Sequence, residues 1–219
     1  MDSEDTMAGF GVEGLLDLYA PVKTQIESRL GEFRRIWAEG SDEDLFRELV
    51  FCLLTPQSRA KTCWAAVERL SEKSMIYRGS AEEIQRELVG VRFNERKAEY
   101  ICLARKMFSS QSLRATLEGF SSAIAAREWL VRNVKGLGYK EASHFLRNIG
   151  LGEELAILDR HILKNLLLLG VIDERPASLT KRIYLEIEKK MTAFSKQVGI
   201  PMGHLDLLLW YKEAGEIFK

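Results

Sequence analysis

With 219 residues, 46% of them hydrophobic and 29% charged, the chain is long enough to bury a sizeable core and has an ordinary globular composition. Its 32 basic and 32 acidic side chains cancel, so binding to nucleic acid would need a local basic surface rather than bulk positive charge. No long apolar stretch and no basic segment leading into an apolar run occurs, and we therefore expect neither a membrane-spanning nor a secreted protein.

Hydrophobic periodicity predicts helices along almost the whole chain, because strand-like alternation is scarce and only four prolines occur. Residues 1–10 are polar, and we expect them to be frayed. The expected helices are, in chain order, 11–30, 43–54, 57–71, 81–88, 95–108, 113–118, 121–133, 139–149, 160–169, 179–197 and 201–215. Glycines mark pattern ends at Gly31, Gly40, Gly79, Gly90, Gly119, Gly150, Gly170 and Gly199. Ser41-x-x-Asp44 and Ser80-x-x-Glu83 resemble capping boxes.

We expect an all-α protein of two lobes. Residues 1–40 plus 179–219 form a terminal lobe in which the N-terminal and C-terminal helices pack together, and residues 41–178 form a central lobe. A cleft is expected between the two lobes. The cysteines at 52, 63 and 102 are widely spaced in apolar helical patterns and odd in number. We interpret them as reduced core residues of a cytosolic protein rather than as a disulfide framework or metal site.

A short glycine hairpin, Val134-Lys135-Gly136-Leu137-Gly138-Tyr139, separates two of these helices within residues 121–149. Gly136 and Gly138 permit positive φ angles and a close approach of another backbone. Their amides, together with the positive end of the following helix, would form a small anion-binding site that fits a DNA phosphate, with Lys135 beside it. A plain turn between helices is the alternative interpretation of the hairpin alone.

Lys140 follows the hairpin, in the first turn of the next helix, and Asp159 lies nineteen residues further on. A neutral amine is a good nucleophile toward C1′ of a nucleoside, and a helix N-terminus with partial desolvation favours the neutral form. Asp159 follows an apolar run and precedes a new helix, so it is an N-cap candidate. A carboxylate held there can stabilise positive charge on a deoxyribose. A solvated or phosphate-binding lysine and a purely structural cap are the alternatives.

This arrangement resembles the helix-hairpin-helix DNA glycosylase superfamily, and within it the 8-oxoguanine DNA glycosylases of the Ogg2 type, from archaea and some bacteria. The resemblance covers about residues 45–219 and implies a two-lobed fold with a cleft between the lobes. It also implies that Lys140 is the catalytic nucleophile and that Asp159 is the superfamily's invariant aspartate. Relatives with an iron–sulfur cluster hold four cysteines near the C-terminus, where this chain has none, so no metal and no cofactor is expected.

The segment Leu53–Lys61 resembles the stretch in which a glutamine enters the duplex. The resemblance implies that Gln57 fills the gap left by the extruded nucleotide and hydrogen-bonds the orphan base, with Arg59 and Lys61 as backbone contacts. A helix N-terminus with an early proline is the alternative interpretation of this segment.

A second segment, Gly90–Ala98, also matches the superfamily. By resemblance, Arg92, Arg96 and Lys97 line the DNA face and Phe93 borders the base pocket.

The C-terminus also resembles the Ogg2 enzymes, which end on a lysine that reaches the pocket. The resemblance implies that Lys219 and its terminal carboxylate reach the flipped purine, that Trp210 stacks on it, and that Asp206 belongs to the same pocket. An acceptor near N7 would favour 8-oxoguanine, whose N7 carries a proton, over guanine. His161 either contacts a phosphate or packs internally, and His144 and His204 are interpreted as structural.

These features predict a bifunctional 8-oxoguanine DNA glycosylase/AP lyase that binds double-stranded DNA containing the lesion, acting as a monomer in the prokaryotic cytoplasm at the nucleoid. Two alternatives stay open. One is the same fold acting on another damaged or mispaired base, and the second is a helix-hairpin-helix module that binds DNA without catalysis.

Overall fold

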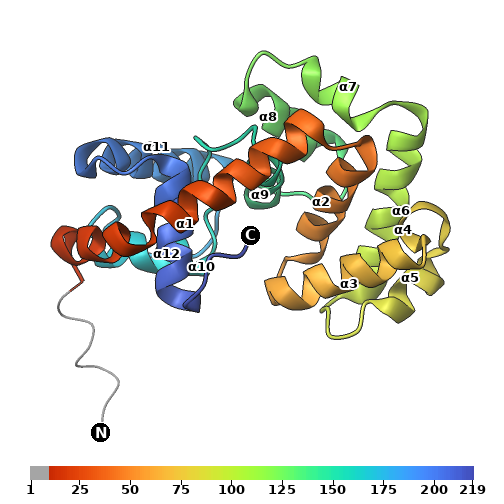
Figure 1. Cartoon of the computed structure of the whole chain (residues 1–219), viewed down its shortest axis with the longest axis horizontal. Helices are drawn as coiled ribbons and strands as arrows, with labels where there is room; N and C mark the ends of the chain where they lie inside the picture. The colour runs from red at the N-terminus through yellow and green to blue at the C-terminus, as the bar shows by residue number, and fades with distance from the viewer. Residues whose placement is uncertain (1–9) are drawn as a thin grey trace, which may run out of the picture. The chain divides into compact units, whose positions relative to one another are not determined.

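The structure is a computed structural model that describes residues 10–219, and these residues form twelve helices and no strand (Figure 1). The expectation for residues 1–9 lies outside the described residues. The first six helices are α1 (Val12–Glu39), α2 (Asp42–Leu54), α3 (Ala60–Glu72), α4 (Met75–Arg78), α5 (Ala81–Glu87) and α6 (Asn94–Ser110). The remaining six are α7 (Leu113–Glu118), α8 (Ala123–Asn133), α9 (Tyr139–Asn148), α10 (Arg160–Leu168), α11 (Lys181–Val198) and α12 (Met202–Ala214). The all-α prediction is confirmed for the described part of the chain.

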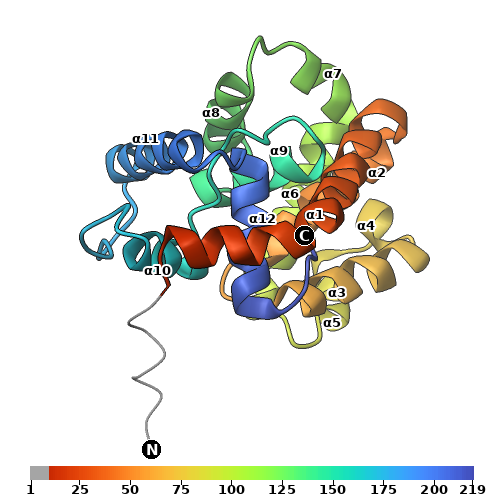
Figure 2. The same cartoon turned by 60° about the vertical axis from the view of Figure 1, so that its left-hand side comes forward.

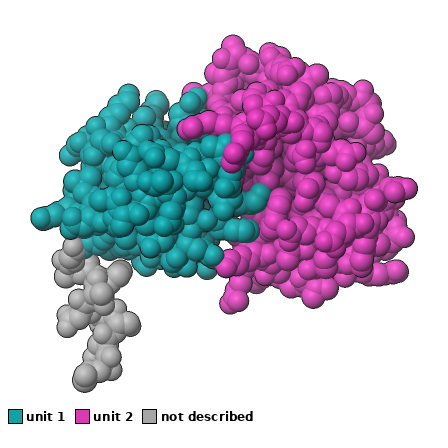
Figure 3. Space-filling model, viewed as in Figure 1, with its two compact units in different colours: residues 1–32, 153–219 teal, residues 33–152 magenta. Residues whose placement is uncertain are grey.

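The chain divides into two compact units, one made of residues 1–32 and 153–219 and the other of residues 33–152 (Figure 3). The first unit contains most of α1 together with α10, α11 and α12, and the second contains α2 to α9. These units differ from the expected lobes in residues 33–40 and 153–178. The expected lobe boundaries and the cleft between the lobes stay predictions.

In the first unit, α12 packs against both α10 and α11 (Figure 2). The apolar run 155–158 is buried and leads into α10. This run is held by α11: the Tyr184 hydroxyl donates to the Ala156 carbonyl at 2.6 Å, and Glu188 accepts from the Ala156 amide at 2.9 Å. The start of α10 is therefore fixed from the side by two side chains of another helix.

In the second unit, α2 is the central helix and packs against α3, α6, α7 and α9. Nine residues of α2 between Leu45 and Leu54 are buried, so this helix is surrounded on most of its faces. The buried carboxylate of Glu48 accepts from the Asn148 side chain of α9 at 3.0 Å. This contact ties α9, which carries Lys140, to the core of the unit.

Most helix ends agree with the expected ones to within three residues, and both capping boxes are confirmed. The Ser80 side chain accepts from the Glu83 amide at 3.2 Å, and Glu83 accepts from the Ser80 amide at 2.7 Å. The largest error is in α1, for which the sequence predicts an end before Gly31 and which runs on to Glu39. Leu30 and Phe33 are fully buried on either side of that glycine, and their packing outweighs the cost of a glycine in a helix.

The four-residue helix α4 has no counterpart in the expected set, because one helical turn is too short to show periodicity. Helix α3 begins at Ala60 rather than at 57. The reason is local: Gln57 has a φ of 55°, in the left-handed region, so it cannot belong to a right-handed helix.

Candidate active site

The hairpin between α8 and α9 is formed largely as expected. Gly136 has a φ of 96°, and a Cβ at that position would collide with the ring of Tyr100, so only glycine fits. Gly138 differs from the prediction: its φ is −93°, an extended conformation, and it is the N-cap of α9. Its amide donates to Glu141 at 3.2 Å. A phosphate at this hairpin would therefore compete with the protein's own carboxylate for the Gly138 amide. Lys135 is exposed beside it.

Lys140 lies in the first turn of α9 and is partly buried. Its ammonium is 3.4 Å from the hydroxyl of Thr55, the C-cap of α2, and 3.6 Å from Glu141. The Thr55 hydroxyl itself donates to the Cys52 carbonyl at 2.9 Å. Thr55 is a neighbour of Lys140 that the sequence did not suggest, since 85 positions separate the two residues. The amine is thus placed by two helices that meet at the end of α2.

Asp159 is the N-cap of α10, as predicted. One carboxylate oxygen accepts from the amides of His161 and Ile162, each at 2.8 Å. The other oxygen accepts from the indole nitrogen of Trp210 at 3.1 Å. Three donors from two helices therefore fix the orientation of this carboxylate. Asp159 belongs to the first unit and Lys140 to the second, so their joint action on one nucleotide is a proposal.

Trp210 is half-buried on α12, and its ring also packs against His161, with ring centroids 5.3 Å apart. The His161 imidazole lies 3.5 Å from the Glu213 carboxylate. These contacts agree with the packing interpretation of His161 that the sequence left open. Trp210 is therefore held between the catalytic carboxylate candidate and an imidazole.

Glu213 anchors this group of side chains on α12. Burial alone would raise the pKa of Glu213, but hydrogen bonds from Lys164 and Asn165 and the charges of Lys164 and Lys212 lower it to about 2. Lys164 donates to both carboxylate oxygens, at 3.0 and 3.1 Å. Glu213, which its lowered pKa keeps ionised near neutral pH, thus connects α10 to α12 beside His161 and Trp210.

Gln57 is exposed in the turn between α2 and α3, with Arg59 exposed two residues later as the N-cap of α3. The turn is closed by a hydrogen bond from the Ser58 amide to the Thr55 carbonyl at 3.0 Å. The exposure of Gln57 at the tip of a closed turn suits insertion into a duplex.

The position of Lys97 differs from the prediction. By resemblance it was expected on the DNA face, but its side chain is buried, with 4% of the residue exposed. Its ammonium donates to the carbonyls of Leu54 and Pro56, both at 2.7 Å, and to the Ser58 hydroxyl at 3.1 Å. A lysine has three donors, and all three are used inside the protein. We therefore assign Lys97 a role in supporting the turn instead of a DNA contact.

Phe93 is the N-cap of α6 and is 54% exposed, with a φ of 57°. Arg92 is exposed as well, and its guanidinium lies 5.8 Å from the centre of the Phe93 ring. The Arg92 amide donates to the Ser58 hydroxyl at 3.0 Å, which joins this loop to the Gln57 turn. An exposed aromatic ring flanked by arginine is suited to contact nucleic acid bases and phosphates.

The C-terminal candidates lie in the first unit. Asp206 is buried, with 2% exposed, one helical turn before Trp210 on α12. Lys219 is half-buried at the end of the chain. Asp206 and Trp210 are four residues apart and lie on the same face of α12.

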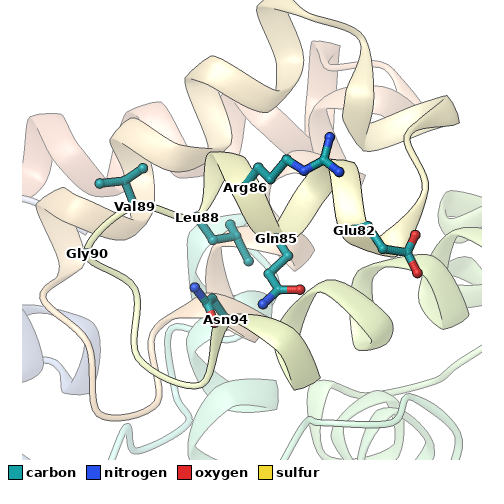
Figure 4. A pocket seen from close by; sticks show the side chains of 7 residues that line it. All are labelled: Glu82, Gln85, Arg86, Leu88, Val89, Gly90 and Asn94. Carbon is teal, nitrogen blue, oxygen red and sulfur yellow. The ribbon is translucent and has the colours of Figure 1, made fainter.

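A shallow hollow in the second unit opens beside α5 and the start of α6 (Figure 4). It contains none of the candidate residues and no aromatic ring, so it is not suited to stack a purine. Its lining residues are Glu82, Gln85, Arg86, Leu88, Val89, Gly90 and Asn94. In the described part of the chain, no helix combines the length and apolar character needed to cross a membrane.

Comparison with known proteins is consistent with this geometry. A family model described as 8-oxoguanine DNA glycosylase matches residues 26–200. The 8-oxoguanine DNA glycosylase/AP lyase of Fusobacterium nucleatum is 48% identical over 205 residues, which cover 92% of this chain and 94% of that protein. The protein of the same name from Korarchaeum cryptofilum is 46% identical over 200 residues, covering 90% and 92%.

Two solved structures are similar over nearly the whole chain. The crystal structure of the 8-oxoguanine DNA glycosylase of Thermotoga maritima has a TM-score of 0.86 at 37% identity, covering 95% of this chain and 98% of that one. The 8-oxoguanine glycosylase/lyase of Methanocaldococcus jannaschii, in complex with a 15mer DNA containing 8-oxoguanine, has a TM-score of 0.87 at 37% identity, covering 95% and 99%.

Proposed function

The chain belongs to the 8-oxoguanine DNA glycosylase family, and we infer from this membership that it excises 8-oxoguanine from DNA and cleaves the strand as an AP lyase. Its helices adopt the helix-hairpin-helix glycosylase fold of these relatives. No observation favours a different lesion or a DNA-binding module without catalysis, the two possibilities that the sequence left open. The geometry of the site supports specific roles for its residues in this chemistry.

The observation that supports the roles of the site residues is the hydrogen bond between Trp210 and Asp159 at 3.1 Å. We propose that a purine stacked on Trp210 presents its glycosidic bond to the Asp159 carboxylate. Because three donors fix that carboxylate, it is ready to stabilise positive charge that develops on the sugar as the base departs.

We propose that the neutral amine of Lys140 attacks C1′ of the flipped nucleotide. A bond forms between Nζ and C1′ while the bond from C1′ to the base breaks, and the base leaves with the electron pair and takes up a proton. The sugar ring then opens to give an imine with Lys140. Loss of a C2′ proton expels the 3′ phosphate, which breaks the strand by β-elimination.

We propose that the base pocket combines Trp210 as the stacking surface with the polar groups of Asp206 and Lys219, and that Phe93 borders it. The lesion differs from guanine in its N7–H donor and its C8 carbonyl. An acceptor directed at N7 would leave the N7 lone pair of guanine facing another acceptor, and this rejects the normal base.

The proposed DNA contacts lie mostly on the second unit. The hairpin at Gly136 and Gly138, with Lys135, binds a phosphate, and Gln57 fills the gap in the duplex. The exposed arginines Arg59 and Arg92 contact the backbone near that gap. For His161, the packing against Trp210 supports a role in holding the ring, and a phosphate contact stays a proposal. We further propose that the protein acts as a monomer, in the cytoplasm and at the nucleoid.

Excision tests this proposal. A duplex with one 8-oxoguanine should lose that base when incubated with the protein, whereas the matched guanine duplex should not. Asp159→Asn keeps an acceptor oxygen at the N-cap but removes the negative charge, so we expect the single-turnover excision rate to fall at least about a hundredfold. Thermal unfolding of this variant serves as the control for folding. A wild-type rate for Asp159→Asn would exclude Asp159 from catalysis.

A further inference from the structure

The buried ammonium of Lys97 is a costly feature that the proposed chemistry does not use. Its three hydrogen-bond partners are two carbonyls and a hydroxyl rather than a carboxylate. Burial lowers the pKa of Lys97 to about 8. A buried cation without an ion-pair partner is unfavourable for stability compared with an apolar side chain of the same size.

Those acceptors surround Gln57. Leu54 and Pro56 precede it, and Ser58 follows it, so the ammonium holds the chain on both sides of the residue. Gln57 itself is exposed and has a left-handed backbone with a φ of 55°. A left-handed conformation costs a non-glycine residue about 1 kcal/mol or more, and it persists only where the surroundings enforce it. Lys97 supplies that enforcement from the protein interior.

The same cation also supports the neighbouring loop. Ser58, which accepts from Lys97, accepts as well from the Arg92 amide at 3.0 Å. Phe93, next in the chain, is also an exposed residue with a left-handed backbone, and it begins the helix that carries Lys97. One buried lysine therefore connects two strained turns, each of which presents a side chain to solvent.

We propose that Lys97 is a positioning residue for Gln57, and that it holds the Thr55–Ser58 turn in its inserting conformation before DNA binds. The proposal rests on the proposed function, in which Gln57 fills the gap left by the extruded nucleotide. A turn that is ordered in advance does not lose conformational entropy on binding, so more of the contact energy remains to support the extruded state. Lys97 acts through Gln57 and touches neither the DNA nor the reacting atoms.

A double-mutant cycle tests this proposal, because a residue that acts through Gln57 has nothing to act on once Gln57 is gone. The variants are Lys97→Met, Gln57→Ala and the double variant, with single-turnover excision of 8-oxoguanine from a duplex as the readout. We expect each single variant to lose about tenfold or more in rate, and the double variant to lose no more than Gln57→Ala alone.

Two further variants complete the experiment, one as a control for the loss of a lysine and one as a second test. Lys106→Met removes an exposed lysine from the same helix and should excise at the wild-type rate. Ser58→Ala removes one of the three acceptors of Lys97, together with the acceptor of the Arg92 amide. It tests the proposal if Lys97→Met does not fold, and it should show the same non-additivity with Gln57→Ala. Borohydride trapping on a duplex with a preformed abasic site checks that Lys140 remains reactive in each variant.

The outcomes separate the positioning role from the proposed function. Additive losses of Lys97→Met and Gln57→Ala would overturn the positioning role while leaving the proposed function intact. A wild-type rate for Gln57→Ala would remove Gln57 from the mechanism, and the role of Lys97 with it. A wild-type protein that does not excise 8-oxoguanine would overturn the proposed function itself.

Discussion

At the scale of single residues, a few side chains of the site carry several contacts each. Asp159 caps α10 and accepts from Trp210, so a structural cap and a candidate catalytic group are the same carboxylate. Thr55 caps α2 and contacts Lys140. Asp159 and Thr55 both lie at helix ends, where backbone groups have no partner within the helix. Hydrogen bonds to these backbone groups fix the two side chains in place.

Trp210→Phe separates stacking from orientation. Phenylalanine keeps an aromatic face for the base but has no indole N–H to donate to Asp159. We expect the excision rate to fall about ten- to a hundredfold, the effect of losing a hydrogen bond to a charged group, while binding of the lesion duplex changes much less. Single-turnover rates and fluorescence anisotropy measure the two quantities. Trp129→Phe, in α8, is the matched control and should leave both unchanged.

The buried Lys97 predicts a pH dependence of stability. Its pKa is about 8 in the folded protein and near 10.5 in the unfolded chain, so between these values the unfolded chain binds more protons. Stability contributed by Lys97 is therefore fully present above about 10.5 and is lost as the pH falls through 8. The charged and titratable neighbours that act on it are Cys63, Lys140, Glu141 and Arg92.

The measurement is the free energy of unfolding of the wild type and of Lys97→Met from pH 7 to pH 10.5. The difference between them should shift in favour of the wild type as the pH rises above 8. A difference that stays constant over this range would contradict the lowered pKa of Lys97.

At the scale of helices, the sequence predicted most of the architecture and missed what depends on tertiary contacts. Periodicity located α9 and α10 closely, and the capping residues at 41 and 80 located two helix starts. It could not show that α1 passes through Gly31, because burial of the flanking residues decides this. The prediction for Lys97 was wrong, although Lys97 shares a helical face with the buried Ala98, Ile101 and Ala104, and that pattern indicates burial.

Two glycine-to-alanine substitutions are expected to change the stability of the protein in opposite directions. Gly136→Ala places a side chain at a φ of 96° and against the Tyr100 ring, so it should destabilise the protein by about 1–3 kcal/mol and weaken DNA binding. Gly31→Ala lies inside α1 with no atom near the added methyl group, so it should stabilise by about 0.5–1 kcal/mol. Chemical denaturation measures both. A Gly136→Ala variant as stable as the wild type would contradict the described hairpin.

At the scale of the whole molecule, a net charge of zero is compatible with DNA binding because the candidate contacts are local. The second unit exposes Arg59, Arg92 and Lys135. In the first unit, the carboxylate of Glu213 is hydrogen-bonded to Lys164 and Asn165. The family relationship identifies the reaction, and the residue assignments say which side chains carry it out. That Lys140 and Asp159, which belong to different units, act on the same nucleotide stays a prediction.

Borohydride trapping shows whether Lys140 is the nucleophile, as we propose. The protein is incubated with a duplex that carries one 8-oxoguanine, reduced, and assayed for a covalent complex, with Lys140→Gln and the exposed-lysine control Lys106→Gln alongside. We predict a complex for the wild type and for Lys106→Gln, none for Lys140→Gln, and a cross-linked peptide that contains Lys140. A complex that persists in Lys140→Gln, or its absence in the wild type, would contradict this claim.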